Sequence, residues 1–219
     1  MHEAVRVVGR GRVGSAVAAR LEERGLKVVE SGADLVLLCV PDAAIATVAR
    51  EIAVGPWIAH VSGATPLAAL DPHVNRFGLH PLQTFTRRRG PEQLDGAWGA
   101  ITGEGRDAEA HARWLADVLG LHPVVIDERD RALYHAGASI ASNYLVTIYR
   151  AAARLVENAG VPAEAIVPLM QRTIDNGFDL TGPIARGDTA TIDAHLDAIN
   201  RHAPDLAPMY KALAAITRP

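Results

Sequence analysis

The chain has 219 residues, of which 49% are hydrophobic, and a formal net charge of −3. This length allows one large domain or two small ones, and the slightly acidic balance argues against nucleic acid or an anionic membrane as a partner. The longest apolar run, residues 35–40, is too short to cross a bilayer. We find no signal-peptide pattern, and Cys39 is the only cysteine, so we expect a cytoplasmic protein without an internal disulfide.

The first motif is a glycine-rich turn between a β-branched run and an Ala-rich stretch that predicts a helix over residues 15–24. In a nucleotide-binding turn, Gly9 allows a tight reversal, Gly11 lets a pyrophosphate approach the backbone, and Gly14 lets the helix pack against the strand. The helix N-terminus adds N–H groups for phosphates. The alternative is a glycine-rich turn that binds nothing. The residues predicted to contact a dinucleotide here are Gly9, Arg10, Gly11, Arg12, Val13 and Gly14.

The second crossover of the predicted sheet is unusually short. Strands are expected over residues 26–30 and 34–40, whereas a parallel crossover normally needs a dozen or more residues. The link must span roughly 19 Å, and about five residues reach only about 17 Å. We therefore predict a shortened second strand or a trimmed sheet edge. Glu30 lies where a carboxylate would bind the ribose hydroxyls of NAD and repel the extra phosphate of NADP.

We expect strands and helices to alternate up to residue 126, and only helices after it. Further strands are expected at 57–61, 75–79, 98–102 and 123–126, with helices at 41–52 and 106–119. Between them, Thr65 is expected to cap a short helix that begins at Pro66. The remaining helices are expected at 129–158, 163–177, 188–201 and 204–217. The predicted fold class is therefore α/β: a Rossmann-like, mostly parallel sheet with a trimmed second crossover in residues 1–126, then an all-helical domain in residues 127–219.

Ligands of open α/β sheets bind at the carboxyl ends of the strands. This rule selects the glycine turn and the segments that contain Pro41, Ser62, and His80 to Gln83. We expect Pro41 and Ser62 to contact the dinucleotide, His80 to be catalytic and Gln83 to contact substrate.

The long helix carries a polar stripe in an Ala-, Gly- and Leu-rich stretch. His135, Ser139, Ser142 and Asn143 are spaced i, i+4, i+7 and i+8, which places them on one face of a regular helix. One interpretation is that these groups only satisfy one another or the backbone. In the other, His135 transfers a proton, Asn143 fixes a carbonyl or carboxylate, and the two serines hold substrate.

Other polar features favour structural roles or remain open. Asp188 is most simply the N-cap of the following helix. Thr181 is retained as a substrate-binding candidate, and residues 87–89, three arginines, are either a solvated surface or an anion site. The nine histidines are dispersed without metal-ligand spacing, so we expect no metal site. No G-x-S-x-G motif is present, and Cys39 lies within a predicted strand.

Several stretches together resemble one bacterial family over nearly the whole chain. They are residues 9–15, 35–42, 60–64, 80–85, 134–136, 142–145 and 181–188. The family has a Rossmann-like N-terminal domain and a helical C-terminal domain of unknown function. It is similar to the 6-phosphogluconate-dehydrogenase-like oxidoreductases, which include ketopantoate reductase, pyrroline-5-carboxylate reductase and prephenate dehydrogenase. The resemblance implies NAD or NADP in the glycine turn, a small-molecule substrate between the domains, and a homodimer through the helical domain.

The chain departs from that pattern in two ways. Its second crossover is trimmed, and it lacks the long-helix lysine that several superfamily members use as general acid, because its only lysines are Lys27 and Lys211. His135 or His80 must then supply the proton, or it comes from water. Our first hypothesis is an NAD(P)-dependent reductase or dehydrogenase of a small oxo or hydroxy acid or an imine. The alternative is a non-catalytic or regulatory protein that kept the scaffold, lost the adenosine pocket and binds another small ligand.

Overall fold

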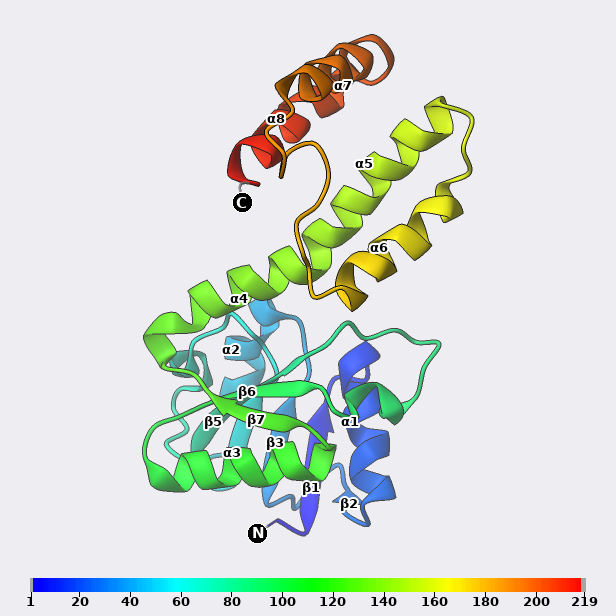
Figure 1. The fold of residues 1–219 in the computed structure, drawn as a ribbon. Helices are drawn as coiled ribbons and strands as arrows, with labels where there is room; N and C mark the ends of the chain where they lie inside the picture. Colours follow the sequence, from blue (N-terminus) through cyan, green and yellow to red (C-terminus); the bar gives the residue numbers. More distant parts are fainter. Residues whose placement is uncertain (1, 218–219) are drawn as a thin grey trace. The chain divides into compact units, whose positions relative to one another are not determined.

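A computed structural model describes residues 2–217 of the chain (Figure 1). The chain divides into two compact units, one ending at Ile140 and the other beginning at Ala141. We call them the sheet unit and the helical unit. The division falls later than the predicted boundary at residue 126, because the short helix η3 (Glu128–Asp130) and helix α4 (Arg131–Ser139) are grouped with the sheet.

The sheet unit contains a seven-stranded sheet in the order β2-β1-β3-β4-β5-β6-β7. Strands β1 to β5 are mutually parallel, whereas β6 runs antiparallel to β5, and β7 is parallel to β6. The sheet is therefore mostly parallel, as predicted. The strands are β1 (Ala4–Val8), β2 (Lys27–Val28), β3 (Leu35–Leu38), β4 (Trp57–His60), β5 (Arg76–Leu82), β6 (Trp98–Gly103) and β7 (His122–Val125).

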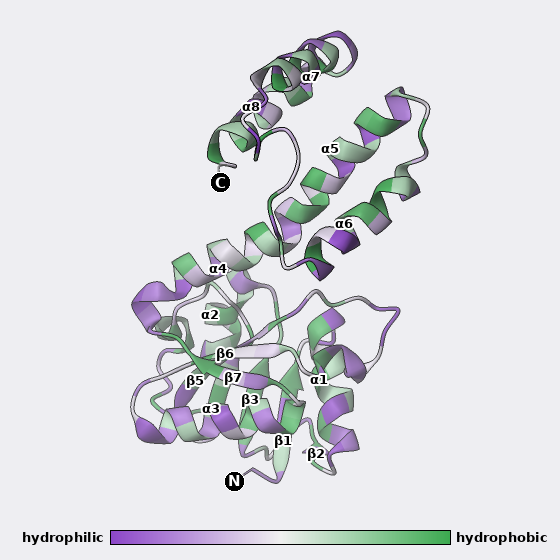
Figure 2. Cartoon of the chain, viewed as in Figure 1, coloured by the Kyte–Doolittle hydropathy of each residue, from purple (hydrophilic) through white to green (hydrophobic). Residues whose placement is uncertain are grey.

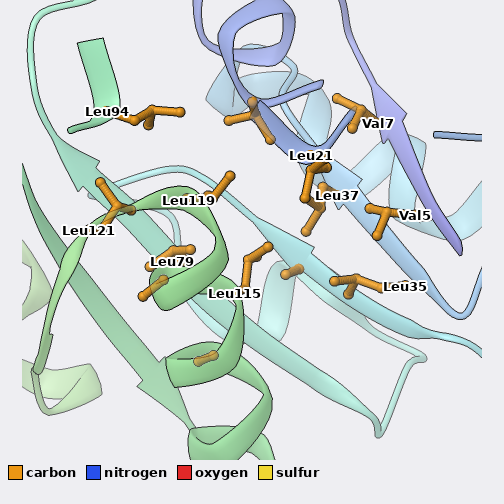
Figure 3. Close-up of a cluster of buried hydrophobic side chains, with 14 of the residues drawn as sticks. Val5, Val7, Leu21, Leu35, Leu37, Leu79, Leu94, Leu115, Leu119 and Leu121 are labelled. Carbon is orange, nitrogen blue, oxygen red and sulfur yellow. The ribbon is translucent and has the colours of Figure 1, made fainter. Parts of the chain in front are cut away.

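Apolar side chains from alternate strand positions form a core on each face of the sheet. On one face, Val5 and Leu37 pack with residues of α1 (Arg12–Glu23) and α3 (Arg106–Leu119), as Figure 3 shows. On the other face, Val36 and Leu38 pack with α2 (Asp42–Glu51) and the short helix η1 (Leu67–Leu70). In Figure 2 strand β3 is hydrophobic, while α1 and α3 alternate between hydrophilic and hydrophobic residues, as helices with one buried side do.

The predicted trimming of the second strand is confirmed. Strand β2 has only two residues, and its pairing with β1 ends where Val28 lies opposite Val5. Strand β3 already begins beside Val5, so the connection has no length for a crossover helix. Because β1 continues to Val8, β2 stops about 10 Å before the end of β1.

Three other expectations are corrected. Thr65 is not the cap of the short helix, which begins at Leu67 and whose Leu67 N–H is bound instead by the Glu128 carboxylate at 2.8 Å. The strand expected to end at residue 79 continues through His80 to Leu82, because β6 pairs with it along that length.

The long helix is also interrupted. A π-helical turn, η4 (Ile140–Tyr144), separates α4 from α5 (Leu145–Asn158). A π-turn has more residues per turn than an α-helix. The spacing i, i+4, i+7, i+8 therefore does not place Ser142 and Asn143 on one regular α-helical face with His135.

Within the described residues, the helical unit contains η4 and α5 of the interrupted helix, three further α-helices and two short 3₁₀ helices. Its elements after α5 are η5 (Ala163–Ala165), α6 (Ile166–Asp175), α7 (Thr189–His202), η6 (Pro204–Leu206) and α8 (Ala207–Ile216). The predicted N-cap is confirmed, since the Asp188 carboxylate accepts from the Thr191 N–H at 3.1 Å. Within residues 2–217, no helix is long and apolar enough to span a membrane.

Candidate functional site

The glycine turn has the geometry of a phosphate cradle. Gly9 has φ +95°, and a Cβ there would lie 2.6 Å from the Cys39 carbonyl oxygen. A Cβ on Gly14 would lie 1.9 Å from the Gly9 carbonyl oxygen, so both predicted steric roles are confirmed. A Cβ on Gly11, in contrast, would meet no atom within 4 Å. No side chain caps α1 at Gly11 and no acidic residue lies in its first turn, which leaves a helix N-terminus suited to an anion.

A second group of side chains gathers past the carboxyl end of β4. A Cβ on Gly63 would lie 2.6 Å from His135 Cδ2 and 3.0 Å from His80 Cε1. The rings of His80 and His135 are 5.9 Å apart and nearly perpendicular. The turn after β4, strand β5 and helix α4 therefore bring these three residues together, and only a glycine fits between the two imidazoles.

Tyr134 completes this group. Its hydroxyl lies 2.7 Å from His80 Nδ1, within hydrogen-bond distance. His80 lies two residues beyond the last β4–β5 pair, which is His60 with Gly78, so it stands at the carboxyl edge. Because β5 is three strands from β1 in the sheet, roughly 14 Å separate His80 from the glycine turn along this edge.

A buried arginine, Arg131, lies next to His60, since both side chains border Gly78. Arg131, at the start of α4, is 3% exposed. Its Nη2 donates to the Ser62 carbonyl at 2.6 Å and its Nη1 donates to Thr102 Oγ1 at 2.8 Å. Glu128 Oε2 lies 3.8 Å from Nη1. The side-chain hydroxyl of Ser62 accepts from the Ala64 and Thr65 N–H groups, so both ends of this turn are held.

Burial makes the site favour uncharged side chains; Arg131 adds to this effect at the two histidines and opposes it at Tyr134. Burial, then His135 and then Arg131, lowers the pKa of His80 to about 4. Burial and Arg131 lower the pKa of His60 to about 3, and burial raises the pKa of Tyr134 to about 12. At neutral pH, His60 and His80 are therefore neutral imidazoles and Tyr134 keeps its proton.

The remaining candidates of the sheet unit occupy separate positions. Pro41 precedes α2 and is exposed, while Ser139 is half-buried, one helical turn beyond His135. Gln83 is bound within its own loop, donating to the Gln93 carbonyl at 3.0 Å and accepting from the Thr84 N–H at 2.8 Å. Glu30 is exposed in the bend after β2. In the glycine turn, Arg10 and Arg12 are exposed and Val13 is half-buried.

Three candidates belong to the helical unit. Ser142 and Asn143 lie in the π-turn, the former half-buried and the latter exposed. Thr181 is exposed in the segment before α7. Their assignment to substrate binding and catalysis stays a prediction.

The sequence interpretation missed Arg131 and Glu128. The only sequence signal is that they lie three residues apart at a helix start, which is common for surface ion pairs. Their partners lie 61 and 69 residues away, at Leu67 and Ser62. His60 was part of the sequence interpretation only as a member of the 60–64 stretch that carries the family resemblance. A buried histidine at the end of a strand, followed by Ser-Gly, was the available indication.

Two further features are the distribution of potential metal ligands and a separate cavity. Within residues 2–217, no three His, Cys, Asp or Glu side chains are grouped so as to hold a metal ion. A shallow cavity of about 490 Å³ lies where β4 begins, at the opposite edge of the sheet from the glycine turn, and His2, Trp57 and His111 line it.

Comparison with known proteins gives a family and a fold. Residues 97–217 match the model of a domain of unknown function, DUF2520. No curated protein sequence matches. A Bacteroides fragilis protein named as a candidate NADP oxidoreductase is similar in structure, with a TM-score of 0.82 and 21% identity over 97% of this chain and 96% of that one.

Two further structures share the fold. A Thermotoga maritima protein has a TM-score of 0.78 and 22% identity, covering 97% of this chain and 96% of its own. A reductive aminase from Aspergillus terreus, solved with NADPH and ethyl levulinate, has a TM-score of 0.69 and 17% identity, covering 98% of this chain and 93% of its own. At these identities the likeness establishes the Rossmann-like fold with a helical region after it.

Proposed function

The chain belongs to the DUF2520 family, and we propose that it is an NAD(P)-dependent oxidoreductase that reduces or oxidises a small oxo or hydroxy acid or an imine. One observation carries the proposal. The same edge of one sheet presents an open glycine turn after β1 and, three strands away on β5, a neutral Tyr–His pair beside a second histidine.

The glycine turn fits a dinucleotide. Space over Gly11 leaves the backbone N–H groups at the start of α1 accessible, and such groups bind a pyrophosphate. Arg10 and Arg12 are exposed beside them and can contribute positive charge. When bound, the nicotinamide cofactor would supply or accept the hydride. Structures sharing this fold include proteins named as an imine reductase and a reductive aminase, which is consistent with a C=N or C=O substrate.

The His80–Tyr134 pair is proposed to supply the proton. With both groups neutral, His80 can give its Nε2 proton to a substrate oxygen or nitrogen while its Nδ1 takes the hydroxyl proton of Tyr134. Arg131 then stabilises the tyrosinate that results, because its positive charge favours the anion. His135 is proposed to border the reacting group. Asn143, Ser139, Ser142, Gln83 and Thr181 remain proposed substrate contacts.

The first experiment is a parallel titration with NADH and NADPH, followed by nicotinamide fluorescence. Micromolar binding of either cofactor supports the proposal. Turnover is then measured on a panel of oxo acids and imines with Tyr134→Phe, which removes the hydroxyl alone. We expect kcat to fall by about 10²–10⁴-fold. The matched control is Tyr210→Phe, because Tyr210 also lies 2.8 Å from a histidine Nδ1, that of His195.

The alternative function is a small-ligand-binding protein without hydride chemistry. The shortened β2 favours it, because the strand that normally borders the adenosine ends early. If neither NADH nor NADPH binds at up to millimolar concentration, the oxidoreductase proposal fails and this alternative replaces it.

We also propose a homodimer formed through the helical unit. Large apolar side chains are exposed on its helices and loops, and a second copy would cover them. They include Leu145, Val146, Ile148, Val167, Leu169, Ile174 and Phe178. Sedimentation equilibrium should give twice the mass of one chain, and Leu169→Lys should lower it to that of a monomer. A monomeric unsubstituted chain would refute the proposal.

A further inference from the structure

Arg131 joins three segments that are far apart in the sequence. Its guanidinium binds the Ser62 carbonyl in the turn after β4 and the Thr102 hydroxyl on β6, at 2.6 Å and 2.8 Å. Its own backbone begins α4, which carries Tyr134 and His135. One side chain therefore fixes the Gly63 turn and the start of the helix relative to each other.

The charge of Arg131 is weakly neutralised compared with that of Arg20, the other deeply buried arginine among residues 2–217. Arg20 is 5% exposed and has two close carboxylates, Asp95 at 2.6 Å and Glu23 at 3.2 Å. Arg131 is 3% exposed, binds two neutral oxygens, and has Glu128 at 3.8 Å. Burial of an incompletely paired charge is costly, and apolar residues often replace such groups without loss of stability. A purely structural role accounts poorly for a cation here.

The weakly neutralised charge of Arg131 lies close to His60. A Cβ on Gly78 would be 3.0 Å from Arg131 Nη1 and 3.2 Å from His60 Cε1, so the cation and this imidazole border the same glycine. The groups that act electrostatically on His80 are His135 and Arg131 from α4 and Asp42 from α2, while His60 is in turn influenced by His80. Asp42 raises the pKa of His80, whereas His135 and Arg131 lower it.

We propose that Arg131 is a positioning residue that locks the Ser62–Gly63 turn against α4 and supplies the fixed positive charge that acts on the His80–Tyr134 pair. The guanidinium remains protonated even in a buried site. It therefore disfavours imidazolium at His80 and favours tyrosinate at Tyr134, and the lowered pKa of His80 agrees with this. The part that the pair plays in proton donation rests on the proposed function. The electrostatic action of Arg131 does not.

The test is an NMR titration of the histidine ring signals in the full chain, with His80 assigned by the loss of its signal in His80→Gln. In Arg131→Met, which keeps a similar length without charge, the titration midpoint of His80 should rise by about one pH unit. In Arg131→Lys, which keeps the charge but not the planar fork, the midpoint should stay low. Arg20→Met is the control, because it removes an equally buried arginine distant in sequence from these histidines, and it should leave the midpoint unchanged.

An unchanged His80 midpoint in Arg131→Met overturns the proposal, as does an equal rise in Arg20→Met. If Arg131→Met does not fold, Glu128→Gln replaces it. That change keeps an oxygen for the Leu67 N–H but removes the carboxylate nearest Arg131, so the His80 midpoint should fall further. An unchanged midpoint there also overturns the proposal.

These readouts need neither cofactor nor substrate. A shift of the His80 midpoint in a protein that binds no NADH or NADPH would refute the proposed function and leave the role of Arg131 standing. In an active enzyme, the acidic limb of the kcat–pH profile should move together with the His80 midpoint. A profile that keeps its shape while kcat falls would show a merely structural arginine.

Discussion

The tight approach of α1 to the glycine turn leads to a prediction about stability that is independent of any ligand. In Gly14→Ala the new methyl group would lie 1.9 Å from the Gly9 carbonyl oxygen and 2.9 Å from Cys39 Cβ. Ordinary contacts are 3.4–4 Å. The first of these atoms is backbone, so the methyl group cannot be accommodated by rotating a flexible side chain. The start of α1 must move away from β1.

The magnitude follows from two opposing effects. Overpacking a close-packed site costs about 1–3 kcal/mol, and a backbone clash lies at the upper end of that range. Replacing glycine by alanine in a helix recovers about 1 kcal/mol at most. We therefore expect a loss of about 2 kcal/mol in the free energy of unfolding, which corresponds to a fall of about 4–8 °C in Tm.

Urea unfolding and calorimetry measure this loss, and Gly11→Ala is the matched control. A Cβ at Gly11 meets no atom within 4 Å and its φ of −73° suits alanine, so stability should change by less than about 0.5 kcal/mol. If NAD(P) binds as proposed, Gly11→Ala weakens that binding, because the methyl group occupies the space through which phosphate reaches the backbone. Equal stability of Gly14→Ala and the unsubstituted chain would refute the steric reasoning.

Three further predictions concern other parts of the chain. Asp188→Ala removes the carboxylate that caps α7, so urea unfolding should show a loss of about 1 kcal/mol, and an unchanged midpoint would contradict the capping role. Glu30→Gln should change the ratio of the NADH and NADPH dissociation constants by less than about threefold, because β2 ends before the carboxyl edge. A tenfold change measured by the same fluorescence titration would instead place this carboxylate at the ribose. His60 has a folded-state pKa of about 3, below the unfolded value of 6.5, so its contribution to stability is complete above pH 6.5 and is lost as the pH falls toward 3, by up to about 1.4 kcal/mol per pH unit. His60→Asn should therefore reduce the slope of unfolding free energy against pH between 6.5 and 5, and an unaltered slope would exclude a contribution from His60.

The parts of the fold that the sequence predicts well depend on local sterics and periodicity. A strand, a glycine pattern and a helix in sequence predict the roles of Gly9 and Gly14. Gly14 approaches Gly9 within that unit, and both glycines also approach Cys39 at the end of the neighbouring strand β3. The shortening of β2 followed from chain length alone, because too few residues were available to cross the sheet.

The sequence failed where a distant partner decides the structure. Nothing near Thr65 indicates that Glu128 will bind the first N–H of the short helix in its place. The extension of β5 through His80 depends on its pairing with β6, and the sequence of β5 alone gives no indication of that pairing. The π-turn at Ile140–Tyr144 likewise changes the helix spacing, and a regular helical period was the only guide to the face that carries His135.

The hydrogen bonds from Glu128 to Leu67 and from Arg131 to Ser62 bear on the order in which the chain folds. Each closes a loop of more than sixty residues, and the entropy of that closure must be met before the contact stabilises anything. During synthesis, the glycine turn and strands β1, β3 and β4 can pair before residue 128 leaves the ribosome, since domains fold from the N-terminus as the chain emerges. The half of the edge that holds the glycine turn therefore forms first, and the half that holds His80 and His135 is completed only when the start of α4 arrives.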